Sequence, residues 1–127
     1  MISVLPSKDK EAIKELFKKY STDFDEFSGC VIAEDGCKQL GFCLYSLNKE
    51  SMTIHVLKPE DDLSLADGIL RSAIHNAVFA KVIKVSYSEK APEDVFRKLD
   101  FILNEEEKML NVSKLYKSCC SCKDKNT

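Results

Sequence analysis

The spacing of apolar residues along the chain predicts two amphipathic helices separated by short strands. Near the start, apolar residues recur every three or four positions among lysines, which indicates a helix over about 8–20 with Ser7 as its N-cap. A longer apolar stripe predicts a helix over 64–80, where Ser64 and Asp67 resemble a capping box. The two stripes are Ala12, Ile13, Leu16, Phe17 and Tyr20, and Ala66, Ile69, Leu70, Ala73, Ile74 and Ala77.

Three short apolar runs between these helices predict an antiparallel meander. The runs are Cys30–Ala33, Leu40–Tyr45 and Met52–Leu57. Asp35-Gly36 between the first two is a strong hairpin signal, and a polar turn at residues 48–50 joins the second to the third. Strands connected by such short turns pair as antiparallel neighbours.

The rest of the chain predicts a parallel crossover followed by short elements. Val82–Tyr87 reads as a strand, and Pro92 suits the first position of a short helix. Two further strands are expected around Ile102 and over Met109–Leu115. The strands on either side of the long helix should be parallel, joined by a right-handed crossover. This order predicts an α+β (mixed α/β) fold with one mixed sheet of about six strands and helices on both faces.

Length and charge narrow the class of protein. A chain of 127 residues corresponds to one domain, and a net charge of -2 gives no electrostatic footprint for nucleic acid. No apolar run approaches the ~18 residues that span a membrane, and the first six residues lack the pattern of a signal peptide. We therefore expect a cytoplasmic protein without a nucleic-acid or membrane partner. The sequence does not indicate the oligomeric state.

The six cysteines are unevenly distributed, and three of them crowd the end of the chain. Cytosolic thiols stay reduced, which argues against a disulfide framework. We expect a domain over residues 1–117 followed by a flexible Cys-rich tail, Ser118–Thr127. Cys119, Cys120 and Cys122 are soft ligands, but they lack the usual two-residue spacer and a nearby His. No metal ligands are assigned, and a thiol-based metal or redox role and an incidental tail both stay open.

Four segments, in this order and spacing, resemble the GNAT superfamily of N-acetyltransferases. They are Asp35-Gly36 with Leu40-Gly41-Phe42, Leu57-Lys58-Pro59-Glu60, Ile69–Ala77, and Phe96–Phe101. The resemblance implies a GNAT-like acyl-CoA-binding domain that transfers an acetyl group from acetyl-CoA to an amine. The amine acceptor is not identifiable from the sequence.

The resemblance also implies which residues would contact acetyl-CoA. The pantetheine arm would lie along the backbone of Val56 and Leu57, and the pyrophosphate would rest on the start of the long helix. The helix-start residues are Ser64, Leu65, Ala66 and Asp67, and side chains near the arm would be Tyr87, Pro92 and Phe96.

The pyrophosphate loop departs from the family pattern. The family has Gln/Arg-x-x-Gly-x-Gly/Ala, whereas this chain has Asp61-x-x-Ser64-x-Ala66, of which only Ala66 conforms. Acidic residues surround the place where the phosphates would sit: Glu60, Asp61, Asp62 and Asp67. Acids also stabilise the start of a helix. Ordinary helix capping and an atypical phosphate loop therefore both stay open.

The catalytic residues are equally atypical. Acetyl transfer needs a base for the amine proton, and His55 on the third strand is the candidate, since histidine titrates near neutral pH. Phe96 stands where the family often has a Tyr acid, and Glu89 where it has an Asn. His55 also reads as a half-exposed strand histidine, and His75 is expected to face solvent. A GNAT-fold module that binds acyl-CoA or a partner without catalysis is therefore the alternative to an enzyme.

Overall fold

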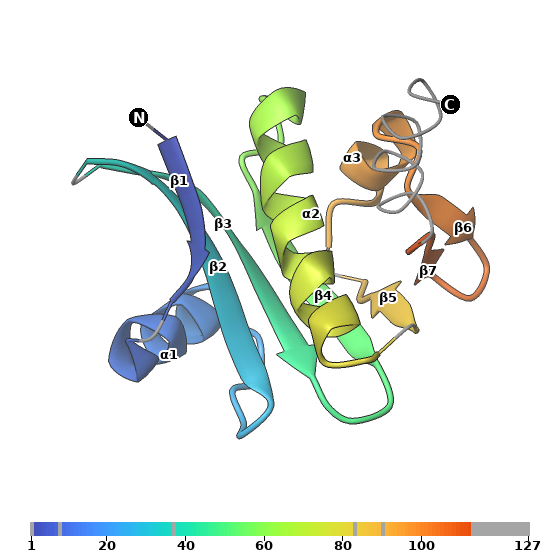
Figure 1. The fold of residues 1–127 in the computed structure, drawn as a ribbon, viewed down its shortest axis with the longest axis horizontal. Coiled ribbons are helices and arrows are strands. Elements are labelled where there is room, and N and C mark those ends of the chain that lie inside the picture. Colours follow the sequence, from blue (N-terminus) through green and yellow to red (C-terminus); the bar gives the residue numbers. More distant parts are fainter. Residues whose placement is uncertain (1, 8, 37, 83, 90, 113–127) are drawn as a thin grey trace, which may run out of the picture.

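A mixed sheet, in the order β1-β2-β3-β4-β5-β7-β6, runs through the computed structural model (Figure 1). The structure describes residues 2–7, 9–36, 38–82, 84–89 and 91–112. The strands are β1 (Ile2–Pro6), β2 (Ser28–Asp35), β3 (Lys38–Leu47), β4 (Met52–Lys58), β5 (Val85–Tyr87), β6 (Ile102–Asn104) and β7 (Met109–Leu110). The helices are α1 (Lys10–Lys19), α2 (Leu63–Phe79) and α3 (Glu93–Lys98).

The predicted fold class is confirmed, with one strand more than expected. β1 to β4 are antiparallel neighbours, β5 is parallel to β4, and β7 and β6 return antiparallel. The sequence prediction missed β1, because Ile2–Pro6 is short and ends in proline. Proline is tolerated there because β1 lies at the edge of the sheet.

Both predicted N-caps are wrong. Asp9, not Ser7, caps α1, and its carboxylate accepts a hydrogen bond from the amide of Ala12 at 3.2 Å. Asp62, not Ser64, caps α2 by accepting from the amide of Leu65 at 3.1 Å. Each aspartate directly precedes the first helical residue and has the extended backbone that an N-cap requires, whereas Ser7 lies further out and Ser64 lies inside the helix.

Two other boundaries differ from the prediction. The predicted strand Val82–Tyr87 forms only over Val85–Tyr87, because the amide of Val82 donates to the carbonyl of Ala77 at 2.8 Å and closes the C-terminal end of α2. Pro92 is the N-cap of α3 rather than its first residue. The Cys-rich tail and the end of the last predicted strand lie outside the described residues.

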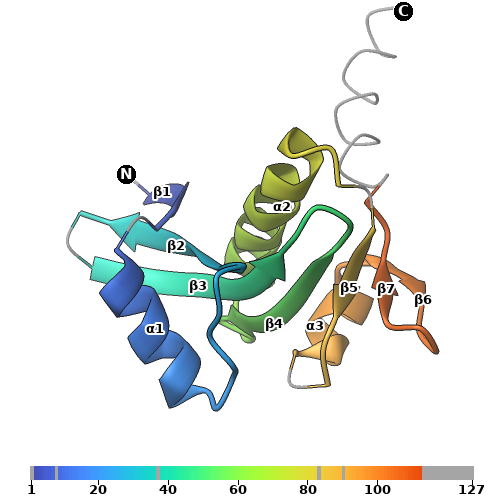
Figure 2. The same ribbon diagram turned by 90° about the horizontal axis from the view of Figure 1, so that it is seen from below.

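Helices cover the two faces of the sheet (Figure 2). On one face, Ile13 and Phe17 of α1 pack against a small cluster of strand residues that includes Cys30. On the other face, α2 and α3 pack on the larger cluster, which includes Cys43. Cys30 and Cys43 are near in register but on opposite faces, since successive strand residues alternate. Within the described residues, no helix is both long and apolar enough to cross a membrane.

Candidate active site

The central feature of the site is the point where β4 and β5 part. The two strands pair in parallel only from Met52–Val85 to Ile54–Tyr87, and the amide of Ser88 makes a further bond to the carbonyl of Ile54 at 2.9 Å. β4 continues to Lys58, whereas the chain after Ser88 turns away into α3. The unequal lengths of the two parallel strands leave a gap beside the second half of β4.

His55 is the first residue of β4 beyond this pairing, and it sits on a β-bulge. The β3–β4 register passes from Tyr45–Ile54 to Leu44–Val56, so His55 is the extra residue on β4. A bulge re-aims the side chain of the inserted residue. The Nε2 atom of His55 lies 2.9 Å from the Oγ atom of Ser46, and its ring centroid lies 6.2 Å from that of Phe17. The half-buried imidazole is thus held on two sides.

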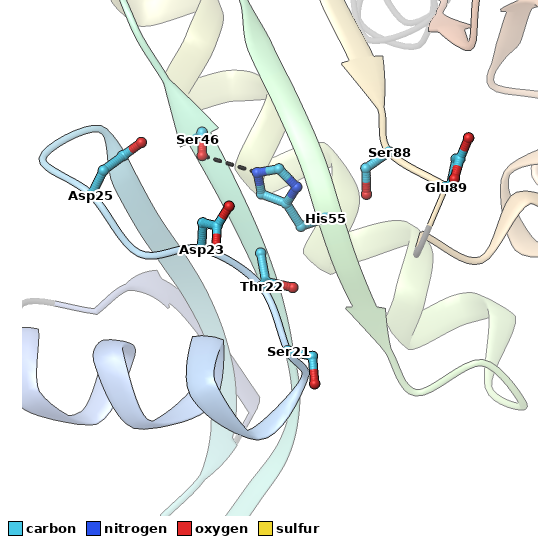
Figure 3. A pocket seen from close by; sticks show the side chains of 8 residues that line it. All are labelled: Ser21, Thr22, Asp23, Asp25, Ser46, His55, Ser88 and Glu89. Atoms are coloured by element: carbon cyan, nitrogen blue, oxygen red, sulfur yellow. Dashed lines mark hydrogen bonds between the residues drawn. The ribbon is translucent and has the colours of Figure 1, made fainter.

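His55 opens onto a cavity of about 560 Å³ (Figure 3). The cavity is bounded by the loop after α1, by β3 and β4, and by the segment after β5. Its lining residues are Ser21, Thr22, Asp23, Asp25, Ser46, His55, Ser88 and Glu89. Figure 3 shows the imidazole between Asp23 and Thr22 on one side and Ser88 on the other. The volume is that of a small-molecule site.

The lining of this cavity is acidic and contains one unsatisfied hydroxyl. Asp23, Asp25 and Glu89 contribute carboxylates, and none of the described lining residues is a lysine or arginine. The Oγ atom of Ser88 is shielded from solvent and has no hydrogen-bond partner among the described residues. A buried hydroxyl without a partner is costly. The acidic lining is therefore suited to a positively charged ligand.

A second cavity, of about 250 Å³, follows β4 beyond His55. It is lined by Tyr20, Val56, Leu57, Lys58, Glu60 and Pro92. Three of the residues expected to contact the pantetheine arm, Val56, Leu57 and Pro92, therefore lie around one cavity. His55 of β4 lines the larger cavity, and the next three residues of β4 line the smaller one.

The start of α2 carries both open donors and acids. Among the described residues, none accepts a hydrogen bond from the amides of Leu63 or Ser64. The Asp62 carboxylate accepts one from the amide of Leu65. Glu60 pairs with Lys58, and the Asp67 carboxylate pairs with the guanidinium of Arg71 at 3.0 Å. Ser64 is exposed, Leu65 and Asp67 are partly buried, and Ala66 is buried. An anion here would meet two amide donors and the carboxylates of residues 60–62.

The remaining candidates lie in the core or on the surface. Tyr87 and Phe96 are buried with ring centroids 5.0 Å apart, and the Tyr87 hydroxyl donates to Glu93 at 2.8 Å. Burial, with the hydrogen bond to Glu93, raises the pKa of Tyr87 to about 12. Neither side chain lines the two cavities. His75 is exposed, as expected.

Four lining residues carry no signal of a site in the sequence: Asp23, Asp25, Ser46 and Ser88. The two aspartates belong to a stretch with three acids that reads as a plain polar loop. Ser46 faces His55 only because the bulge sets the register between β3 and β4. No group of three or more His, Cys, Asp or Glu residues in the described ranges is arranged to hold a metal ion.

Comparison with solved structures identifies the fold. A GNAT-family acetyltransferase from Streptococcus pneumoniae superimposes with a TM-score of 0.53 at 16% identity, covering 80% of this chain and 88% of that one. A ribosomal-protein-alanine N-acetyltransferase from Brucella melitensis biovar Abortus superimposes with a TM-score of 0.59 at 12% identity, covering 78% of this chain and 90% of that one. A GNAT-family protein from Desulfovibrio desulfuricans superimposes with a TM-score of 0.55 at 10% identity, covering 79% of this chain and 83% of that one. No protein-family model and no curated protein sequence matches the chain.

Proposed function

We propose that this chain, which has the GNAT fold, is an N-acetyltransferase that transfers an acetyl group from acetyl-CoA to an amine. The observation that carries the proposal is the bulged His55 beside the gap between β4 and β5, which lines one cavity while the next residues of β4 line another. The larger cavity would take the amine and the narrower one the thioester arm.

The residues around the narrow cavity fit a pantetheine arm. The arm is a slender chain that needs backbone and apolar walls, and Val56, Leu57 and Pro92 supply them. The diphosphate end would use the open amides of Leu63 and Ser64 at the positive end of the α2 dipole. The carboxylates of Glu60, Asp61 and Asp62 oppose an anion there, so we expect weaker binding than an uncharged loop would give.

His55 would act as the general base. Acetyl-CoA, when bound, supplies an acetyl group whose carbon–sulfur bond breaks as the bond to the amine nitrogen forms. His55 holds the proton that the amine gives up, and solvent can protonate the departing sulfur. Ser46 positions the imidazole through its 2.9 Å hydrogen bond, and Phe17 packs against the ring. Imidazole is the side chain that changes charge near neutral pH without special tuning.

The experiment combines cofactor binding with turnover. Acetyl-CoA is titrated calorimetrically into the reduced protein, and acetylation of a panel of amines is then followed by thiol release. In His55→Ala, we expect at least a hundredfold loss of kcat with acetyl-CoA affinity changed less than threefold. His75→Ala is the matched control, since His75 is exposed on α2 outside both cavities. Unchanged turnover in His55→Ala removes His55 from the mechanism.

A module without catalysis has two observations in its favour. The acids at the start of α2 and the Phe at position 96 are both unlike a working GNAT site. If millimolar acetyl-CoA gives no binding signal, the acetyltransferase proposal is rejected and the fold serves another purpose.

A further inference from the structure

We infer that the acceptor in the 560 Å³ cavity is a small aliphatic diamine or polyamine, that is, an amine with at least one further positive charge. The inference rests on the proposed function for its reaction, and on the cavity itself for binding.

The negative charge of the cavity lining favours a ligand with more than one positive charge. The walls carry three carboxylates, from Asp23 and Asp25 on the loop after α1 and from Glu89 after β5. The amine that attacks must first lose its proton and therefore its charge. A monoamine would leave all three carboxylates facing a neutral ligand. A diamine keeps a second ammonium group through the reaction, and this group continues to balance the carboxylates.

Ser88 supplies a separate indication of a ligand. Its Oγ atom is shielded from solvent and lacks a hydrogen-bond partner among the described residues. In Figure 3 its side chain lies on the same cavity as His55. If the Ser88 side chain turns toward the cavity, its oxygen can accept a hydrogen bond from an amine N–H, which satisfies both groups. The reacting nitrogen would then lie between Ser88 and His55.

The position of the acids divides the cavity into two parts. Glu89 directly follows Ser88, so it belongs to the end where the reacting amine would lie. Asp23 and Asp25 belong to the opposite wall. The second ammonium group would therefore be bound by Asp23 and Asp25. A concave site of this volume suits a small molecule better than a folded protein.

The test measures amine binding without acetyl-CoA, so that it does not depend on the cofactor. Spermidine, 1,4-diaminobutane and the matched monoamine butylamine are titrated into the full chain by calorimetry at low salt. We expect both polyamines to bind at least tenfold more tightly than butylamine, and the difference to shrink as salt screens the exposed carboxylates. Equal affinities, or no binding of any of the three at millimolar concentration, overturn the inference.

Variants locate the second ammonium group. The double variant Asp23→Asn with Asp25→Asn should bind 1,4-diaminobutane about tenfold more weakly than the wild type, while its affinity for butylamine should stay within twofold. An asparagine oxygen can still accept the bonds that Asp25 accepts from the amide of Phe27 and from Ser28, so the loop should keep its shape. Glu26→Gln is the control, since Glu26 lies on the same loop but outside the cavity lining. An equal effect of Glu26→Gln and the double variant overturns the assignment.

The two proposals fail in different ways. If the polyamines bind as expected but acetyl-CoA does not, the acetyltransferase proposal fails and the cavity assignment stands. If acetylation occurs but butylamine and a lysine-rich peptide are used as efficiently as spermidine, the enzyme stands and the polyamine assignment fails.

Discussion

Replacing Gly41 by alanine tests how β3 supports the end of β4. Gly41 is buried in β3, beside the end of β4. A Cβ atom built on it would overlap the carbonyl oxygen of Lys58 and would lie 2.7 Å from Pro59 Cδ and 2.9 Å from Ile69 Cδ1. The first of these is a backbone atom that cannot move without displacing β4. Only glycine therefore fits here.

The expected loss of stability follows from the kind of atom that the added Cβ would overlap. Overpacking of a core costs about 1–3 kcal/mol, and a clash with backbone belongs in the upper half of that range. We expect Gly41→Ala to lower the free energy of unfolding by about 2–3 kcal/mol. With a urea m-value of about 1–3 kcal/mol/M, the unfolding midpoint should fall by roughly 1 M.

Gly68→Ala is the matched control in the same assay. Gly68 lies in α2, is exposed, and a Cβ built on it meets nothing within 4 Å. Because alanine is the better helix former by about 1 kcal/mol, this variant should be more stable than the wild type. The reasoning is refuted if urea unfolding gives Gly41→Ala wild-type stability, or if Gly68→Ala is the less stable variant of the two.

Three further predictions concern thiols, a buried phenol and the α2 cap. Burial raises the pKa of Cys43 and raises that of Cys30 to about 12, so both thiols should resist alkylation at pH 8 until urea unfolds the chain. Peptide mass spectrometry after alkylation checks this, and labelling of either cysteine in the folded protein contradicts it. The pKa of Tyr87 lies near 12 when folded and near 10 when unfolded, so the free energy of unfolding should be constant below pH 10 and fall between pH 10 and 12. In Tyr87→Phe that particular fall should be absent, and an identical pH profile would contradict the assignment. Asp62→Asn should keep the thermal midpoint, since Asn caps as well as Asp, and should strengthen acetyl-CoA binding about threefold in calorimetry. An unchanged affinity would mean that Asp62 does not face the phosphates.

The fold was predictable because its main elements have clear periodicity. The stripe from Ala66 to Ala77 and the Asp35-Gly36 turn each predict one local structure, and the crossover rule fixes how the parallel strands connect. β1 is not predictable in this way, because its five residues end in proline, show no clear hydrophobic periodicity and form a strand only by pairing with β2. Ser7 and Ser64 were mistaken for caps because Asp9 and Asp62 have the same capping chemistry at nearby positions.

The site was less predictable because its members meet only through tertiary register. His55 could be chosen from its residue type and its place on a strand. Its contact with Ser46 depends on the bulge that shifts the β3–β4 pairing, and a bulge leaves no reliable mark in a single sequence. Asp23 and Glu89 are far apart in the chain and share a cavity only because β4 and β5 part between them.

This dependence on backbone also explains why the fold is recognisable at 10–16% identity. The gap beside β4 is formed here by a short β5, a bulge and a turn into α3, which are features of the backbone rather than of particular side chains. A thioester arm held largely by backbone can therefore be kept while side chains change. Proton transfer and recognition of the acceptor have no such freedom, because they need particular groups at particular positions. Under the proposed function those roles would fall to His55 and the carboxylates of the larger cavity, so that is where activity and specificity should be tested.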